Sequence, residues 1–380
     1  MTIAVGALIF ASSAPAGATP PAADFGLSHR VCSAPSAGSA ACDALVVDRA
    51  NGSPSATSAP TGLSPATVKS AYGFSTSATA GSGKTVAIVD AYNDPSAESD
   101  LAVFSSTFGL PSCTTANGCF QKVNQTGGTT PPKTNTGWAL EISLDIQWAH
   151  AIAPGAKVLL VEANSASFAD LLTAENYAKT HATYVSNSWG GSESSGESAN
   201  DAAFVQPGVS FFVSAGDAGL PAEYPSSSPN VISVGGTTLK FSSSGALLSE
   251  TGWTSGGGGC SAYEPANAAQ LAYSGYAQAN CAGKRATPDV SLDADPASGV
   301  SVYDTTRYQG QSGWFKVGGT SASSPMWAAR SAVAGAVVDA SYVYGGSIAY
   351  RDITSGNNGA PCLVGFDLCS GRGSWIGATP

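Results

Sequence analysis

The chain has 380 residues, of which 11% are charged, and its formal net charge at pH 7 is −10. Soluble domains carry about 25% charged residues, so this chain has few groups that could form a basic patch, and nucleic acid is excluded as an expected partner. Lys and Arg together number only 16. Protonation of the carboxylates in acid would therefore leave a modest positive charge. No apolar run is long enough to cross a bilayer, and we expect no membrane partner.

The first 60 residues predict export and processing. Residues 3–11 form a short apolar run before Ala16-Gly17-Ala18, so residues 1–18 are interpreted as a signal peptide. This run lacks the positively charged start of such peptides, which suggests a truncated beginning. Residues 19–60 are rich in Ala, Ser, Pro and Gly and predict a propeptide remnant or linker with little regular structure. We expect a secreted, extracellular protein whose single large domain spans residues 61–380.

The cysteines agree with that location. An even number at close spacing in an exported chain favours disulfides over a metal site. Spacing alone also allows other pairings. The local pairs are Cys32 with Cys42, Cys113 with Cys119, Cys260 with Cys281, and Cys362 with Cys369.

From residue 61 onward, strand-like apolar runs alternate with helical stretches. This alternation predicts an α/β fold with a doubly wound parallel sheet flanked by helices. The expected strands are residues 85–89, 158–162, 183–186, 209–214 and 231–234, and the expected helices include residues 97–108 and 168–179.

The helical segment 137–153 carries two carboxylates among apolar residues. Glu141 and Asp145 stand four residues apart, on the same face of a helix. Two like charges in apolar surroundings raise at least one pKa, so the pair tends to share a proton. A solvated helix face is the alternative interpretation. The apolar flanks and the lack of any Lys or Arg between Lys133 and Lys157 disfavour it.

Two turns also carry candidate chemistry. Asp217 lies in SAGDAG, directly after the expected strand 209–214. Ligands of open α/β sheets bind beyond the carboxyl ends of the strands, although a capping aspartate is an equal alternative. Ser321 lies in GGTSASSP ahead of an apolar helical run, which presents its hydroxyl at a helix N-terminus. An ordinary Ser/Gly turn is the alternative there.

A serine nucleophile needs a base, which is usually histidine. The chain has three histidines. His29 lies in the N-terminal stretch, and His150 and His181 lie at expected helix ends. None has a setting that would aim an imidazole at Ser321. We therefore expect a carboxylate to act as the base.

Together these residues resemble the catalytic set of the sedolisins, the serine-carboxyl peptidases. The resemblance continues from about Leu63 through segments such as KTVAIVDAYNDP, VSNSWGG and RATPDVSLDADP. It implies a subtilisin-like fold and an acid-acting endopeptidase with Ser321 as nucleophile. Glu141 would be its general base and acid. Asp145 would support Glu141, and Asp217 would line the oxyanion hole.

The resemblance also implies how substrate is held. Residues Ser188, Trp189 and Gly190 would lend a backbone edge to an extended protein or peptide substrate, and we expect a monomer. A subtilisin is the nearest competing assignment because Asp90 occupies the place of its triad aspartate, but no His-Gly-Thr segment follows. Two other activities stay open: a catalytically silent relative that binds polypeptides, and a tripeptidyl exopeptidase.

One Ca²⁺ ion is implied near the C-terminus. Asp352 and Asp367 would bind it by side chain, and Ile353 and Gly365 by backbone carbonyl, which gives the oxygen ligands that Ca²⁺ requires. A further carbonyl is expected from Leu363, where the family usually has glycine.

Overall fold

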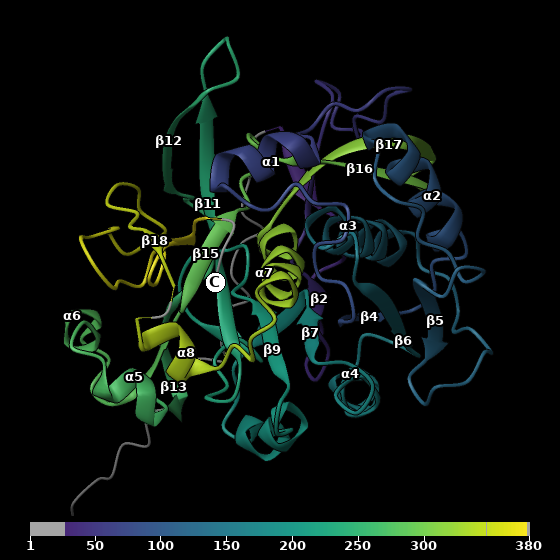
Figure 1. Ribbon diagram of the computed structural model, residues 1–380. Coiled ribbons are helices and arrows are strands. Elements are labelled where there is room, and N and C mark those ends of the chain that lie inside the picture. The colour runs from purple at the N-terminus through teal and green to yellow at the C-terminus, as the bar shows by residue number, and fades with distance from the viewer. Residues whose placement is uncertain (1–26, 347, 378–380) are drawn as a thin grey trace, which may run out of the picture.

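The computed structural model describes residues 27–346 and 348–377 (Figure 1). Its centre is an eight-stranded sheet whose strands are parallel except β12, which is antiparallel to β11. The α/β fold predicted from the sequence, with its central parallel sheet, is confirmed. The strand order is β12 (Leu247–Gly252), β11 (Ile232–Phe241), β9 (Ser210–Ser214), β7 (Tyr184–Asn187), β4 (Thr85–Ala91), β6 (Lys157–Ala163) and β5 (Phe120–Asn124), and β15 (Val290–Asp293) also pairs with β11.

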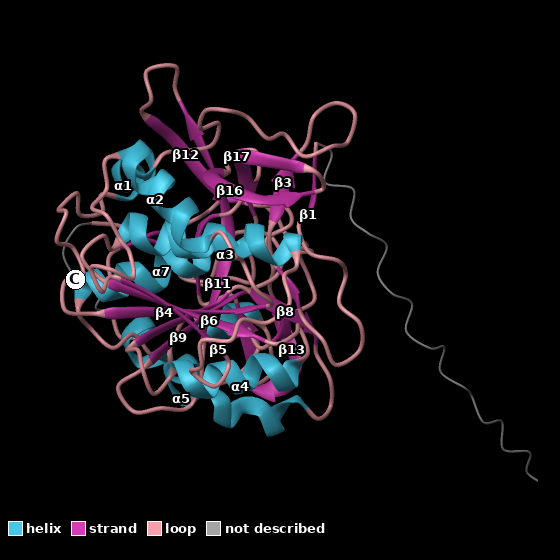
Figure 2. Cartoon of the chain, turned by 90° about the vertical axis from the view of Figure 1, so that its right-hand side faces the viewer, coloured by secondary structure: helices cyan, strands magenta, loops and turns pink. Residues whose placement is uncertain are grey.

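Two long helices lie side by side on one face of this sheet (Figures 1 and 2). They are α3 (Thr136–Ile152) and α7 (Thr320–Ala334). The opposite face is covered by α4 (Phe168–Ala178), which packs on β4 and β6. Two more helices flank α3, namely α1 (Pro65–Tyr72) and α2 (Ala97–Phe108).

Helix α3 is the most deeply buried element of the site. The side chain of Asn135 accepts hydrogen bonds from the amides of Gly137 and Trp138 and so caps its N-terminus. Every residue from Gly137 to Ile152 is buried. A helix that is surrounded by protein is typically apolar all round, and the two acidic residues of α3 are exceptions that lie in the core, away from water.

Between residues 27 and 60 the structure has three short strands of two or three residues each, joined by irregular segments. The interpretation of residues 19–60 as a propeptide remnant or linker stays a prediction. These short strands are held by pairing with neighbouring strands more than by a hydrophobic pattern of their own. The interpretation of residues 1–18 as a signal peptide lies outside the described residues. The first small sheet contains β1 (Ser28–Arg30), β3 (Leu45–Val47), β17 (Gln311–Gly318) and β16 (Val300–Tyr308), and the second contains β10 (Glu223–Tyr224), β8 (Trp189–Ser192) and β2 (Ala41–Cys42).

The periphery is made of short elements and disulfides. All four cysteine pairs expected from the spacing are disulfides, which confirms that pairing. Within the described residues, no helix combines the length and apolar character needed to cross a membrane. The remaining elements are η1 (Glu197–Phe204), β13 (Gly259–Pro265), α5 (Ala268–Ala272), α6 (Tyr276–Ala279), β14 (Lys284–Thr287), α8 (Ala340–Tyr344), β18 (Tyr350–Arg351) and β19 (Ser374–Trp375).

Candidate active site

Ser321 lies in the first turn of α7 and is fully buried. Gly319, two residues before Ser321, has a φ of +102°, a conformation that glycine adopts without strain. The Ser321 amide donates a hydrogen bond to the carbonyl oxygen of Asp43 at 2.9 Å. Its hydroxyl donates to the carbonyl of Ser188 at 3.2 Å. The helix start therefore directs the Ser321 amide at the Asp43 carbonyl and the Ser321 hydroxyl at the Ser188 carbonyl.

A cluster of three carboxyl groups stands beside this serine. One oxygen each of Asp90, Glu141 and Asp145 lies within 4.8 Å of the others. Asp90 comes from the C-terminal part of β4, and the other two come from the inner face of α3. None of their six oxygens has a hydrogen-bond partner among the described residues. Without a cation in contact, such a cluster is stable only when protons neutralise it.

Burial is the main cause of the high pKa values in this cluster. It raises the pKa of Glu141 and of Asp145 well above the ordinary values. The charges of Asp145 and Asp90 raise the pKa of Glu141 further, and the charge of Asp90 raises that of Asp145. The Ser321 hydroxyl opposes the rise at Glu141. Burial, followed by the charge of Glu162, raises the pKa of Asp90 to about 8. The group can thus hold and pass protons in acid solution.

Asp217 approaches Ser321 from the opposite side, in the turn after β9. Its Oδ1 accepts a hydrogen bond from the Thr320 amide at 2.7 Å, while Oδ2 has no partner among the described residues. Burial raises the pKa of Asp217 to about 7, although Arg30 and the Thr320 amide lower it. Because Oδ1 already accepts the hydrogen of the Thr320 amide, the proton of the neutral carboxyl group is placed on Oδ2.

Gly319 explains how close Asp217 stands to the peptide group over Ser321. A Cβ atom on Gly319 would lie 2.1 Å from the carbonyl oxygen of Asp43 and 2.6 Å from Asp217 Oδ2. Both oxygens thus occupy the space that a side chain would fill. A protonated Asp217 and the Ser321 amide are then the two donors available to the oxygen of a peptide at this place.

The predicted substrate-binding segment, residues 188–190, offers its backbone and not its side chains to a peptide. Trp189 is fully buried, and its indole donates to the carbonyl of Val89 at 2.8 Å. The carbonyl of Ser188 accepts the Ser321 hydroxyl, and Trp189 and Gly190 are the residues of β8 that pair with β2. This edge binds a strand of the chain itself, because β2 pairs antiparallel with β8. Backbone pairing of this kind accepts many sequences.

The residues expected to bind calcium come together in one loop. Asp352 Oδ2 accepts a hydrogen bond from the Gly365 amide at 2.9 Å. The buried Asp367 accepts three from the amides of Leu363, Cys369 and Ser370. No donor of the described residues bonds to the carbonyls of Ile353, Leu363 or Gly365. By contrast, the carbonyls of the intervening residues Val364 and Phe366 accept hydrogen bonds from the Gln278 side chain. Carboxylates and free carbonyls form the oxygen donor set that suits Ca²⁺.

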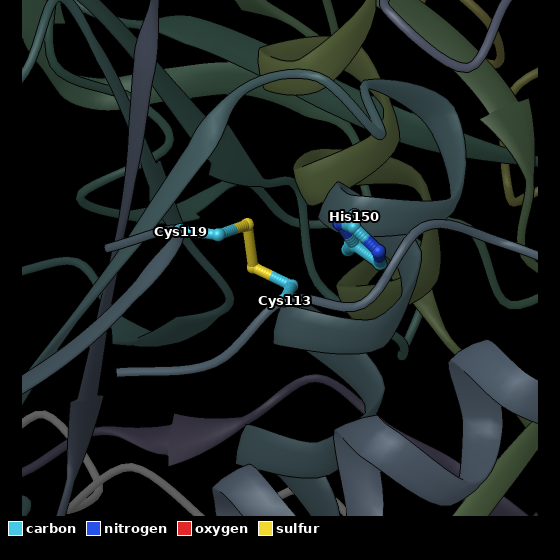
Figure 3. A group of neighbouring side chains, drawn as sticks. All are labelled: Cys113, Cys119 and His150. Atoms are coloured by element: carbon cyan, nitrogen blue, oxygen red, sulfur yellow. A yellow bond between two sulfur atoms is a disulfide. The ribbon is translucent and has the colours of Figure 1, made fainter. Parts of the chain in front are cut away.

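The histidines lie away from Ser321. His29 pairs with Asp48 at 2.8 Å, and His181 is exposed and stacks on Tyr177. His150 bonds through Nε2 to the carbonyl of Pro111 at 2.8 Å. Figure 3 shows His150 near Cys113 and Cys119. Those two sulfur atoms form a disulfide, so they offer no thiolate to a metal ion.

Two participants were not predicted from the sequence. Asp90 was considered only as a subtilisin-type aspartate, yet its position at the end of a buried strand is the kind of signal that marked Asp217. Asp43 gave no usable signal, because it lies in a stretch of Ala, Ser and Pro.

The comparisons with known proteins place this fold in a known class. A model described as "Subtilase family" matches residues 133–341. Kumamolisin from Bacillus sp. (strain MN-32) is 31% identical over 368 residues, a match covering 85% of this chain and 64% of kumamolisin. Sedolisin from Pseudomonas sp. (strain 101) is 36% identical over 144 residues, covering 32% of this chain and 23% of sedolisin. The chain thus spans less than two thirds of the length of either relative.

A solved structure gives the same result. Pseudomonas sedolisin, a serine-carboxyl proteinase complexed with two molecules of pseudo-iodotyrostatin, matches with a TM-score of 0.69 and 28% identity, covering 83% of this chain and 96% of that one. The chain belongs to the subtilase family, within its sedolisin branch. The resemblance drawn from the sequence is therefore confirmed.

The buried carboxyl groups predict that the fold is more stable in acid. Unfolded carboxyls titrate near pKa values of about 4, whereas burial raises the pKa of Asp217 to about 7 and that of Asp90 to about 8. Between these values the native state binds more protons than the unfolded state. The free energy of unfolding should therefore fall as the pH rises from about 4 to about 8.

Urea unfolding of the Ser321→Ala variant across this pH range measures the effect without self-digestion. Adding Asp90→Asn should flatten the slope by up to about 1.4 kcal/mol per pH unit, because asparagine binds no proton in either state. The exposed Asp339→Asn replaces a carboxylate by an amide away from the site and serves as the control. Stability that is flat or rises over this range contradicts the assignment of neutral buried carboxyls.

Proposed function

We propose that the protein is a secreted serine-carboxyl endopeptidase that hydrolyses peptide bonds in acid solution. The observation that carries this proposal is a peptide group seated at the site. The carbonyl oxygen of Asp43 accepts the Ser321 amide at 2.9 Å and lies beside Asp217 Oδ2. An oxygen in this position is where negative charge develops when a serine attacks a peptide carbonyl.

The chemistry follows from the proton positions. Glu141 is the ionised member of the cluster at the start of the reaction, while Asp145 and Asp90 hold the cluster's protons. The Ser321 hydroxyl turns from the Ser188 carbonyl to Glu141, transfers its proton there and attacks the substrate carbonyl carbon. Glu141 then returns the proton to the leaving amine, and water hydrolyses the acyl-enzyme by the same route.

Acid conditions are required by the oxyanion donor. Asp217 donates a hydrogen bond only while it is protonated, and as a carboxylate it repels the oxyanion. Its pKa of about 7 keeps Asp217 protonated throughout acid solution. The four disulfides support secretion, because such bonds persist in oxidising compartments.

An endopeptidase is favoured over a tripeptidyl exopeptidase by the path of the bound strand. Residues 41–42 pair with β8 on one side of Ser321, and residues 45–46 pair with β17 on the other. A polypeptide thus continues in both directions from the bond over the serine. A chain with a free end is not needed.

The first prediction concerns the nucleophile. Ser321→Ala should abolish hydrolysis of a fluorogenic peptide at acid pH, because no acyl-enzyme can form. Ser331→Ala is the matched control. Ser331 is a buried serine on the same helix that donates to the Trp327 carbonyl and is remote from the cleft. Full activity of the Ser321 variant, or equal loss in both variants, contradicts the proposal.

The second prediction concerns Asp217. Asp217→Ala should lower kcat by roughly 10²- to 10³-fold, the usual loss for one oxyanion donor. Asp217→Asn should retain much of the rate and extend activity to higher pH, because an amide donates at every pH. The measurement is kcat against pH for the three proteins on one peptide. Equal rates for alanine and wild type at the acid optimum would mean that Asp217 only caps a turn.

The third prediction concerns calcium, which we propose is held by Asp352, Asp367 and the carbonyls of Ile353, Leu363 and Gly365. A chelator should lower Tm, because an ion that binds only the native state stabilises it. The Asp367→Asn variant should have a lower Tm from the start and respond little to the chelator. Identical melting of metal-free and calcium-loaded wild type would leave these aspartates as turn residues only.

A further inference from the structure

A further acidic residue is buried beside the carboxyl cluster. Glu162 lies near the C-terminal end of β6, and only 1% of its surface is exposed. In the parallel pairing of β4 with β6 it stands directly opposite Asp90. Side chains at paired positions of neighbouring strands lie on the same face of a sheet. Glu162 and Asp90 are therefore neighbours on the face that α3 covers.

Glu162 flanks Asp90 on the side away from the nucleophile. Strand β4 lies between β7 and β6 in the sheet (Figure 1). Helix α7, which begins at the nucleophile, packs mainly on β7 and β9, whereas Glu162 belongs to β6. A charge on Glu162 therefore acts on the cluster from the end opposite to Ser321.

Two donors fix the carboxyl group of Glu162. Its Oε1 accepts a hydrogen bond from the Asp94 amide at 3.0 Å and lies 3.5 Å from Lys122 Nζ. The Lys122 ammonium is itself held, because it donates to Asn93 Oδ1 at 2.8 Å and to the Asp94 carbonyl at 2.7 Å. Lys122 lies on β5, with 26% of its side chain exposed. A charge on Glu162 is thus balanced by a fixed cation, whereas neither oxygen of Asp90 has a donor among the described residues.

The other charged groups around this pair are mostly acidic. Glu141 and Asp145 face Asp90 from α3, and Asp94 faces Glu162 from the turn after β4. Helix α4 covers the opposite face of β6, so the sheet separates its charged residues from Glu162. The more distant groups are Asp100 of α2 and Asp304 of β16, which face Asp94, and Asp170, Glu175 and Lys179 of α4.

The two paired carboxyl groups influence each other's protons. Burial raises the pKa of Glu162 to about 7, and Lys122 lowers it. Burial, followed by the charge of Glu162, raises the pKa of Asp90 to about 8. Glu162 is thus neutral in acid and ionised near pH 8, where its charge opposes the loss of a proton from Asp90. In the mechanism above Asp90 holds a proton, because a second negative charge beside Glu141 in a space without solvent is costly.

We propose that Glu162 is a positioning residue of the peptidase, whose negative charge, fixed by Lys122, keeps the proton on Asp90 as the pH rises. Glu162 thereby extends the pH range in which the carboxyl cluster can act. The inference rests on the proposed peptidase function. A purely structural role, in which Glu162 and Lys122 only tie β5 and the turn after β4 to β6, is the interpretation to be tested against it.

The kinetic test removes the charge of Glu162 in a protein whose oxyanion donor does not titrate. In Asp217→Asn the upper limb of kcat against pH reports the cluster, because the amide donates at every pH. Adding Glu162→Gln should move that limb to lower pH by roughly one unit, as expected for the loss of a neighbouring like charge. The acid limb should stay in place, because Glu162 is neutral there. Glu162→Asp retains the charge and should keep most of the upper limb.

Glu175→Gln in the same Asp217→Asn protein is the matched control. Glu175 is a buried glutamate of α4, and burial raises its pKa to about 8. The substitution removes a buried carboxyl group on the opposite face of the sheet and should leave the upper limb unchanged. If Glu162→Gln lowers Tm but leaves the upper limb in place, Glu162 is only structural. An equal shift in the control also contradicts the proposal.

A second measurement needs no turnover. Infrared difference spectra of the full chain with Ser321→Ala follow the carbonyl band of protonated carboxyl groups as the pH rises. Comparison with Asp90→Asn, in each background, identifies the part that is due to Asp90. Its midpoint should fall by roughly one pH unit when Glu162→Gln is added, and an unchanged midpoint overturns the inference. If no protein hydrolyses any peptide while the midpoint still moves, the peptidase proposal fails and the coupling of Glu162 to Asp90 stands.

Discussion

The structure depends on burying several carboxyl groups where no water can solvate their charge. Glu141 and Asp145 lie on a helix that is covered on all sides, and Asp90 faces them from the sheet. A buried ionised carboxylate without a partner is costly, so these groups are held neutral or share protons. That one constraint sets the protonation state of the site and the pH at which it can act. It also destabilises the fold where the groups must ionise.

The arrangement of helices α3 and α7 converts this constraint into a site. The two helices pack side by side on the sheet, so that the carboxyl groups of one meet the first turn of the other. The hydroxyl and the amide of Ser321 then both lie at the N-terminus of α7. Asp217 lies beside them, in the turn that follows β9. The groups come from α3, from α7 and from the turn after β9, and the close packing of these elements on the sheet fixes their relative positions.

The N-terminal strands show where sequence patterns lose their value. Hydrophobic periodicity reports a side chain's own environment, but residues 28–48 are held by the backbone edges of β8 and β17 and by a disulfide. Small residues such as Ala41 and Ala44 suit a narrow cleft and also suit a linker. Only the pairing distinguishes a bound strand from a disordered one.

The sequence by itself determined the sheet, the local disulfides and the family, because these depend on periodicity, spacing and ordered motifs along the chain. It also singled out Glu141, Asp145, Asp217 and Ser321, since acidic residues in apolar segments and polar turns after strands stand out locally. Only the tertiary structure decided that these four groups meet, that Asp90 joins them, and that Asp43 lies over the serine. Those facts join residues separated by up to 278 positions, and the contacts between distant segments follow from packing, which no local pattern records.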